Sequence, residues 1–437
     1  MKIKNFTKIF LFVAVAALFS CSSSSDGDGD GDGDGGGGVT SISVTASSQF
    51  VDFGSTINFT VKTNEGTDVT SSATILVNNE SIGGSAFTAT ETGEYSVKAT
   101  YETFTSAAIN VNVLPIIVSV ETRTAQDTYN LGDRIEFEVF GIDNDGGETN
   151  VTSASTVFVN GTESFSGSNV IPGDTGTMDA YATFNGFTSE VKTVTVEDNA
   201  STPATFDKRA LIEDYTGTWC GWCPRVSYGI ELVKEASDKV AVVAVHSGDV
   251  MQNSYGSTLI GTFNPGGSYP TAILNRDVAW NYPEPNNVNQ VTAGALGSTS
   301  TGVAIATAIK GNNLSFMVSA GFGQNLSGAK LVVLLLENGL MYDQANYTDY
   351  YGGADVLENF VHDHVLRYAF TNPLGDAIPG GELTAGNTYR MKMEYTIPTN
   401  VVTNAAKAEL VAMVVNSNNE LINVNFVKVG EKSDFSN

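Results

Sequence analysis

An internal repeat in the N-terminal half constrains the fold of this chain more than any other feature. The segment "DVTSSATILVN" at residues 68–78 returns as "NVTSASTVFVN" at residues 150–160. Likewise "ATYETFTSAAINVNV" at 99–113 returns as "ATFNGFTSEVKTVTV" at 182–196. The copies lie 82 or 83 residues apart, which is the length of a small β-sandwich. The repeat therefore predicts two tandem copies of one module.

The segments around the repeats alternate between apolar and polar residues, as strands with one buried face do. Examples are "INFTVKT", "YSVKATY" and "RIEFEVFGI", each bounded by Gly, Asn or Asp. We expect two immunoglobulin-like β-sandwiches, over residues 39–115 and 116–198, that act as a spacer. Adhesion or glycan binding is the alternative, but the sequence offers no aromatic cluster or acidic metal cage to support it.

Length and composition place the repeats in a larger, mostly β protein. A chain of 437 residues is long enough for three or four domains. Charged residues make up only 16%, and Gly, Ser, Thr, Asn and Val are frequent, which favours strands and turns. The net charge of −26 argues against nucleic acid and anionic lipid surfaces as partners.

The N-terminus has the features of an export signal. Residues 1–20 begin with lysines and continue into the short apolar stretch "IFLFVAVAALF". The stretch ends in "LFSC", which resembles the lipobox of bacterial lipoproteins and implies acylation of Cys21. An ordinary secretory signal is the alternative. Residues 21–38, "CSSSSDGDGDGDGDGGGG", cannot bury an apolar face, so we expect a lipid-anchored, disordered acidic tether.

Residues 199–300 change in character and predict a small α/β domain. "RALIEDYTG" and "KVAVVAVHS" have the composition of buried strands, and "YPTAILNR" of a further strand after a proline. Between the first two, residues 224–236 place Val226, Ile230 and Val233 on one helical face. Residues 301–437 return to strand patterns such as "KLVVLLLENG" and "ELVAMVVNS", which predict a C-terminal β-sandwich.

The stretch "TWCGWCPR" at residues 218–225 carries the clearest chemistry. The chain has three cysteines, and lipidation of Cys21 leaves Cys220 and Cys223 to pair with each other in an exported compartment. A thiol must ionise before it attacks a disulfide, and a helix N-terminus favours the thiolate. We therefore expect Cys220 to attack and Cys223 to resolve the mixed disulfide.

A strand, "WCGWC", a helix and a later strand opened by proline together resemble the thioredoxin superfamily. The resemblance implies that Asp214, rather than Glu213 on the opposite strand face, is a buried acid that assists proton transfer. It also implies that Pro270 lies near the sulfurs as a cis-proline after Tyr269, although most X–Pro bonds are trans. Trp219 would pack against the active site.

Two departures from that superfamily leave the direction of the redox reaction open. Gly221 and Trp222 stand between the cysteines where thioredoxin has Gly-Pro, and Pro224 removes a backbone donor from the first helical turn. Both changes affect the stability of the thiolate and hence the reduction potential. An exposed Trp222 would suit docking of a protein substrate or a partner, with Trp219 and Tyr269 lining the same groove.

The combination of "LIEDYTGTWCGWCPR", "YPTAILNR" and "FVHDHVLR" in a β-rich C-terminal half resembles the outer-membrane-protein-28-related family. That family consists of Bacteroidota lipoproteins that join a thioredoxin-like domain to a β-sandwich. The resemblance covers roughly residues 205–437 and implies an outer-membrane location, on the periplasmic or cell-surface face, but no particular substrate. Exported protein thiols or disulfides and a redox partner would be its partners, and we expect no cofactor and no metal.

Three alternatives to exchange chemistry remain. Cys220 and Cys223 could join two of the three histidines, His246, His362 and His364, in a zinc site, but the usual His-x3–5-His spacing is missing. His246 could instead serve Cys220 as the base of a cysteine hydrolase. The third is a surface binding or scaffold protein in which the disulfide is structural, although so small a loop adds little stability.

Overall fold

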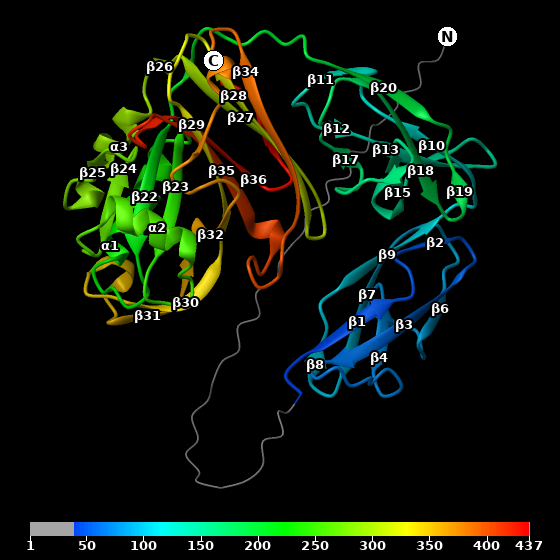
Figure 1. Cartoon of the computed structure of the whole chain (residues 1–437). Coiled ribbons are helices and arrows are strands. Elements are labelled where there is room, and N and C mark those ends of the chain that lie inside the picture. The colour runs from blue at the N-terminus through cyan, green and yellow to red at the C-terminus, as the bar shows by residue number, and fades with distance from the viewer. Residues whose placement is uncertain (1–38, 437) are drawn as a thin grey trace, which may run out of the picture. The chain divides into compact units, whose positions relative to one another are not determined.

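The computed structural model describes residues 39–436 (Figure 1). The predicted signal peptide, Cys21 and the tether lie outside the described residues. The prediction of a mostly β chain with several sheets is confirmed, and only three α-helices occur between residues 39 and 436. The chain divides into two compact units, one built mainly from Thr56–Thr88 and Tyr95–Val111, the other including everything described from Asn112 onward.

The strands of the first repeat form two sheets. One has the order β1 (Ile42–Ala46), β3 (Thr56–Thr63), β6 (Ala86–Thr88). The other has the order β2 (Phe50–Asp52), β9 (Ile109–Leu114), β7 (Gly93–Tyr101), β4 (Thr74–Val77), β5 (Glu80–Ser81), with β8 (Phe104–Thr105) paired to β7.

The second repeat has the corresponding sheets and one small addition. The first has the order β10 (Ile117–Arg123), β13 (Glu138–Asp143), β14 (Glu148–Asn150). The second has the order β11 (Thr128–Asn130), β20 (Lys192–Glu197), β18 (Gly176–Phe184), β15 (Thr156–Val159), β16 (Thr162–Glu163), with β19 (Phe187–Thr188) on β18. The pair β12 (Ile135–Glu136) and β17 (Asn169–Val170) corresponds to the pairing of β3 with β6 in the first repeat, so the addition is β14.

The two repeats share details as well as strand order. In each, the larger sheet begins with a parallel pair, β2 with β9 and β11 with β20. The buried Ser106 hydroxyl accepts from the Ala99 amide, and the buried Ser189 hydroxyl accepts from the Ala182 amide, both at 3.0 Å. The repeated "FTS" of the sequence thus fixes the same turn twice.

The remaining chain is organised around one nine-stranded sheet. Its order is β25 (Val278–Ala279), β24 (Thr271–Leu274), β22 (Ala210–Thr216), β23 (Val240–His246), β32 (Val365–Ala369), β29 (Lys330–Glu337), β35 (Ala408–Val415), β36 (Leu421–Lys428), with β33 (Asp376–Ala377) on β29. Strands of the predicted α/β region and of the predicted C-terminal sandwich therefore belong to a single sheet, joined where β23 meets β32 in parallel.

Three smaller sheets and three helices complete this part (Figure 1). A four-stranded sheet has the order β34 (Thr388–Thr396), β28 (Asn313–Phe322), β27 (Thr301–Lys310), β37 (Lys432–Ser433). Two-stranded sheets pair β21 (Phe206–Asp207) with β26 (Ser298–Thr299) and β30 (Leu340–Ala345) with β31 (Val356–His362). The helices are α1 (Pro224–Ala236), α2 (Ser254–Phe263) and α3 (Val288–Gly294).

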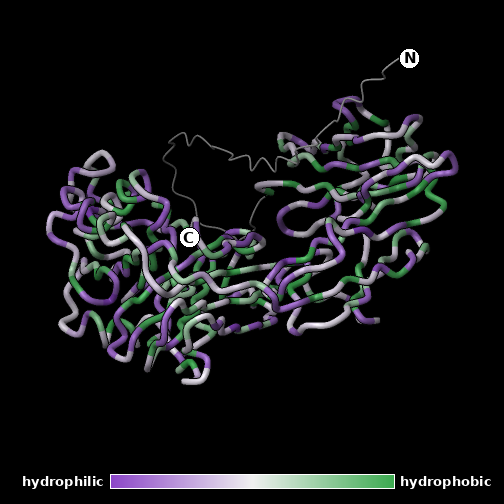
Figure 2. The backbone as a smooth tube through the Cα atoms, turned by 90° about the horizontal axis from the view of Figure 1, so that it is seen from above, coloured by the Kyte–Doolittle hydropathy of each residue, from purple (hydrophilic) through white to green (hydrophobic). Residues whose placement is uncertain are grey.

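Apolar residues on both faces of the nine-stranded sheet are buried, so central strands such as β29 are hydrophobic along most of their length. On one face Val333 and Leu335 of β29 pack with Phe316 of the four-stranded sheet. On the other, Leu334 packs in a core that includes Leu259 of α2. Along the tube in Figure 2, short hydrophobic and hydrophilic stretches alternate, as expected where other strands bury one face only.

Helix α1 fixes where the cysteines lie. It connects two parallel strands, β22 and β23, and packs Val226 and Val233 against Ile212 and Val242 of those strands. Its residue range is the one expected from the sequence. Because α1 starts soon after β22 ends, residues 217–223 form a short loop at the carboxyl end of β22, and this loop holds both cysteines.

Candidate functional site

Cys220 and Cys223 are joined by a disulfide in the loop between β22 and α1, with 5.4 Å between their Cα atoms. The Cys220 amide donates to the Gly217 carbonyl, and the Cys223 amide donates to the Cys220 carbonyl, both at 3.0 Å. Cys223 is the N-cap of α1, and Pro224 occupies the first helical position, where a missing amide hydrogen does no harm. Cys220 thus lies one turn ahead of the helix. Cys220 is 4% exposed and Cys223 1%.

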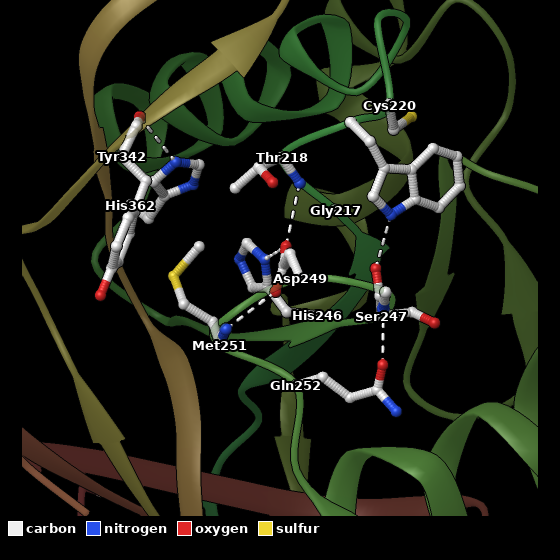
Figure 3. Close-up of polar contacts among 12 residues, drawn as sticks. Gly217, Thr218, Cys220, His246, Ser247, Asp249, Met251, Gln252, Tyr342 and His362 are labelled. Atoms are coloured by element: carbon white, nitrogen blue, oxygen red, sulfur yellow. Dashed lines mark hydrogen bonds and ion pairs between the residues drawn. The ribbon is translucent and has the colours of Figure 1, made fainter. Parts of the chain in front are cut away.

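Aromatic side chains flank the disulfide loop on both sides. Trp219 and Trp222 are each about half exposed, at 51% and 52%. The Trp219 indole donates to the Ser247 carbonyl at 2.7 Å (Figure 3) and meets Tyr269 edge-on, with ring centroids 5.4 Å apart. Trp222 meets Tyr347 edge-on at 5.9 Å. The loop therefore presents two aromatic pairs, each completed by a tyrosine from another element.

Tyr269 and Pro270 directly precede β24, which pairs with β22 in antiparallel register. The Tyr269–Pro270 peptide bond is cis, and Thr271 lies opposite Tyr215. This register brings the proline segment to the end of β22 where the cysteine loop starts. The structure therefore brings Trp219 and Tyr269 together beside the cysteine loop.

Asp214 and Glu213 point to opposite faces of β22 and have different surroundings. Glu213 forms a fully buried ion pair with Arg276 at 2.8 Å and accepts a hydrogen bond from the Tyr215 hydroxyl at 3.0 Å. Asp214 lies on the face of Ile212, which packs on α1. Its Oδ1 atom is buried and has no hydrogen-bond partner among the described residues. Burial, with a smaller effect of Glu284, raises the pKa of Asp214 to about 8.

A small cavity of about 90 Å³ adjoins Asp214. The register of the parallel strands places Thr216 opposite His246, so both share the strand face of Asp214 and line the cavity with it. Gln344 and His362 belong to the same wall. A space of this size with polar walls can hold a few water molecules.

His246 is held by Asp249 in a cluster that sequence reasoning did not find (Figure 3). The Asp249 carboxylate lies 2.7 Å from His246 Nδ1 and accepts from the amides of Thr218 and Met251, both at 2.9 Å. Burial raises the pKa of Asp249. The hydrogen bonds, that of His246 first, lower it by more, so the pKa of Asp249 lies below its ordinary value. The spacing His-x2-Asp is the only signal in the sequence that could have indicated the pair.

His362 packs edge-on against His246, with ring centroids 5.3 Å apart. Burial, followed by the neighbouring His246, lowers the pKa of His362 to about 4. His364 also lines the cavity, but it does not continue the strand, since β31 ends at His362 and His364 has a φ of 57°. It contacts Glu409 and Lys234, each at 2.9 Å. His362 and His364 therefore do not share a strand face.

This arrangement supports neither of the other cysteine chemistries weighed above. In Figure 3 the Cys220 sulfur points away from the His246 imidazole, which a hydrolase base would have to approach. The cysteines bind each other, and His246 binds Asp249. Within residues 39–436 no group of three or more His, Cys, Asp and Glu side chains is arranged to hold a metal ion.

The segment Gln344–Tyr347, here called the strap, runs alongside the cysteine loop in space. The sequence analysis did not predict this contact. The Gln344 side-chain amide donates to the Cys220 carbonyl at 3.0 Å and to the Gly217 carbonyl at 3.3 Å. The Ala345 amide donates to the Thr218 carbonyl at 2.9 Å, and the Tyr347 amide to the Gly221 carbonyl at 2.6 Å. More than 120 residues separate the two segments in the sequence, so no local pattern predicts their pairing.

Solved structures resemble the chain only weakly. HBP35 of Porphyromonas gingivalis is 18% identical over 51% of this chain and 76% of its own, with a TM-score of 0.41. The Escherichia coli adhesin FdeC is 12% identical over 90% and 98%, with a TM-score of 0.19. Domains 5–6 of the S-layer protein SbsC are 17% identical over 37% and 99%, with a TM-score of 0.16. All three scores lie below 0.5, so neither a common fold nor a common function follows.

No curated protein matches the chain. None of the helices between residues 39 and 436 combines the length and apolar character needed to span a membrane. The family comparison is positive: residues 257–433 match outer membrane protein Omp28. The matched range includes β24, the strap and most of the nine-stranded sheet, and it starts after the cysteine loop. The match over residues 257–433 supports the resemblance to this family that the sequence predicted.

Proposed function

We propose that this protein carries out thiol–disulfide exchange on exported proteins, through a thioredoxin-like unit formed by β22, α1, β23 and β24. The observation that carries the proposal is the position of the disulfide. Cys220 and Cys223 lie between a buried strand and a helix N-terminus, and the buried Asp214 on that strand has a carboxylate oxygen free to take a proton. A disulfide in such surroundings can open to a stabilised thiolate.

The reaction can be written from the oxidised state that the structure contains. A substrate thiolate attacks Cys220 Sγ, a mixed disulfide forms, and the Cys220–Cys223 bond breaks to leave a thiolate on Cys223. Asp214, which is protonated at neutral pH because its pKa is raised to about 8, can donate its proton to that thiolate. A second substrate thiolate then attacks the substrate sulfur, so a substrate disulfide forms and Cys220 leaves as a thiolate. This thiolate takes a proton from water to give the dithiol form of the protein.

Each step is reversible, so the same residues serve reduction of a substrate disulfide. Cys220 attacks the substrate disulfide as the thiolate, and a mixed disulfide forms. Asp214 then accepts the proton of the Cys223 thiol while Cys223 attacks Cys220 Sγ and releases the substrate. Cys220 is the more accessible of the two, with 4% against 1% exposure, which agrees with its role as the attacking sulfur. Trp219, Trp222 and Tyr269 would contact the substrate beside it, with Pro270 shaping the groove.

The family match and the N-terminal sequence together support an outer-membrane location. Residues 257–433 match outer membrane protein Omp28, and acylation of Cys21 would supply the anchor. The two repeats at residues 39–198 would act as immunoglobulin-like spacers between anchor and redox unit. Exported protein thiols or disulfides and one redox partner are the proposed partners.

A scaffold function is the second candidate, and the burial of both cysteines favours it. With exposures of only 4% and 1%, the disulfide could be inert and the chain could bind partners through its β modules. A loop of two residues between the cysteines limits what such a bond adds to stability. This candidate predicts that the disulfide resists reduction by ordinary dithiol buffers.

The full chain, purified without its signal peptide, decides between the two in a disulfide reduction assay. With dithiothreitol as electron donor, wild-type protein should accelerate reduction of a test protein disulfide such as that of insulin. Cys220→Ser should abolish the acceleration, and Cys223→Ser should accumulate a mixed disulfide with the substrate. If Cys220→Ser matches the wild type, exchange chemistry at this site is wrong.

A further inference from the structure

The strap is attached to the cysteine loop closely enough to form part of any site there. Its backbone and the Gln344 side chain donate to the carbonyls of Gly217, Thr218, Cys220 and Gly221. Gln344 is 3% exposed, so its hydrogen bonds to the loop are shielded from water. The strap, which lies in the range that matches Omp28, thus holds the cysteine loop in place from Gly217 to Gly221.

Tyr347 lies directly over Gly221, the first residue between the cysteines. A Cβ atom at position 221 would come within 2.4 Å of Tyr347 Cδ2, closer than real Cβ contacts come. A side chain at position 221 would therefore have to displace the Tyr347 ring, which occupies that space. Tyr347 itself remains 63% exposed, so the opposite part of its ring is available to another molecule.

Trp222 and Tyr347 together form an uncharged, half-exposed surface beside Cys220. Their rings meet edge-on, and neither side chain carries charge. Trp219, which directly precedes Cys220 in the sequence, forms a second aromatic pair with Tyr269. With Cys220 only 4% exposed, a thiol has to reach it between large rings, which suits a narrow extended chain better than a bulky folded surface.

We propose that Tyr347 is a specificity-determining residue for the exchange reaction, and that its ring, with Trp222, binds an apolar side chain next to the reacting cysteine of an extended polypeptide. The inference rests on the proposed function and names its substrate class. Apolar contact at this surface lowers the energy of the encounter with such a polypeptide, because both rings lose water-exposed area. A small dithiol makes no such contact.

The oxidised full chain allows a direct test with three thiols of known chemistry. These are dithiothreitol and two single-cysteine peptides, one with phenylalanine on both sides of the cysteine and the other with serine. Thiol trapping then gives the rate constant for reduction of the Cys220–Cys223 disulfide by each thiol. Tyr347→Ala should lower the rate constant for the phenylalanine peptide about tenfold, and those for the serine peptide and dithiothreitol less than twofold.

Two further variants separate ring contact from loop support. Tyr347→Phe keeps the ring and should stay within twofold of the wild type for all three thiols. Tyr342→Ala removes another exposed tyrosine of the same hairpin and should behave likewise. Because Tyr347 is largely exposed, Tyr347→Ala should unfold at the same temperature as the wild type within a few degrees, which excludes misfolding.

The outcomes distinguish this inference from the proposed function. If Tyr347→Ala slows all three thiols equally, or none of them, the assignment of Tyr347 as a specificity residue is wrong although exchange stands. If the wild-type disulfide reacts with none of the thiols, the exchange function fails and the inference falls with it. Selective loss with the phenylalanine peptide alone supports both.

Discussion

Asp214 and Glu213 are adjacent in β22, yet one has an unpartnered carboxylate oxygen beside a cavity and the other is neutralised by Arg276. The alternation of side chains along a strand makes this difference possible. The two acids therefore have different surroundings on the same strand. Glu213 is held in a buried ion pair, and Asp214 is the acid to which the proposed function assigns proton exchange.

Asp214→Asn should stabilise the protein at neutral pH. The raised pKa of Asp214, about 8, means that the folded state keeps a proton that the unfolded chain loses above about pH 4. Wild-type stability therefore falls as the pH rises from 4 to 8, and the variant should not share this loss. We expect the advantage of Asp214→Asn to grow across this range to roughly 5 kcal/mol.

Tryptophan fluorescence during urea unfolding measures this effect locally. All three tryptophans, Trp219, Trp222 and Trp280, lie in the region of the nine-stranded sheet, so their signal reports the unfolding of the compact unit that contains this sheet. The same variant should slow resolution of the mixed disulfide at pH 7. A pH-independent stability difference would show that Asp214 is ionised in the folded protein.

Glu213→Gln should destabilise the protein strongly. The substitution leaves the Arg276 guanidinium buried without its counter-charge, since both side chains of the pair have 0% exposure. Breaking a buried pair from one side costs about 3–5 kcal/mol. Lys432→Gln provides the control, because its ion pair with Asp434 is exposed and should contribute less than about 1 kcal/mol. Similar losses for both variants would contradict the assigned role of Glu213.

Gly221 and Tyr347 should behave as a coupled pair. Gly221→Ala places a methyl group against the Tyr347 ring and should cost about 1–3 kcal/mol. In the double variant Gly221→Ala/Tyr347→Ala the space is vacated, so its loss of stability should be at least about 1 kcal/mol smaller than the sum of the single losses. Urea unfolding of the four proteins measures the coupling, and additive losses would mean that the ring moves aside freely.

His362 should remain neutral down to low pH. Its pKa, lowered to about 4 by burial and His246, lies below the ordinary value near 6.5. Between these values the unfolded chain binds a proton that the folded protein does not, so this side chain reduces stability as the pH falls from 6.5 to 4, by up to about 3 kcal/mol. The proton resonances of its imidazole should titrate near pH 4 in the wild type. A midpoint near 6.5 would place His362 in contact with water.

Local patterns in the sequence predicted the elements that carry the cysteines. Helix α1 begins at Pro224 and ends at Ala236 because proline can start a helix and Val226, Ile230 and Val233 repeat at helical spacing. The apolar stretches "ALIEDYT" and "VAVVAVH" form β22 and β23. The choice of Asp214 over Glu213 came from the resemblance to the thioredoxin superfamily, and the two-residue period of a strand placed the two acids on opposite faces.

Contacts between distant segments could not be predicted in this way. More than 120 residues separate the strap from the cysteine loop in the sequence, and its hydrogen bonds go mainly to backbone carbonyls. Every residue type has such a carbonyl, so the sequence does not indicate these bonds. The single bridge between β23 and β32 that continues the sheet into the C-terminal strands is likewise a pairing of backbones. Residue periodicity tells which face of a strand is buried, but not which strand lies beside it.

The equilibrium reduction potential of the Cys220–Cys223 pair tests the central claim most directly. It can be measured on the full chain in glutathione and dithiothreitol buffers with thiol trapping. Exchange activity predicts a value in the range of known exchange enzymes, roughly −120 to −270 mV, and its position against the redox potential of the surroundings gives the direction of the reaction. A value well below about −300 mV would mark a structural disulfide and would contradict the exchange function.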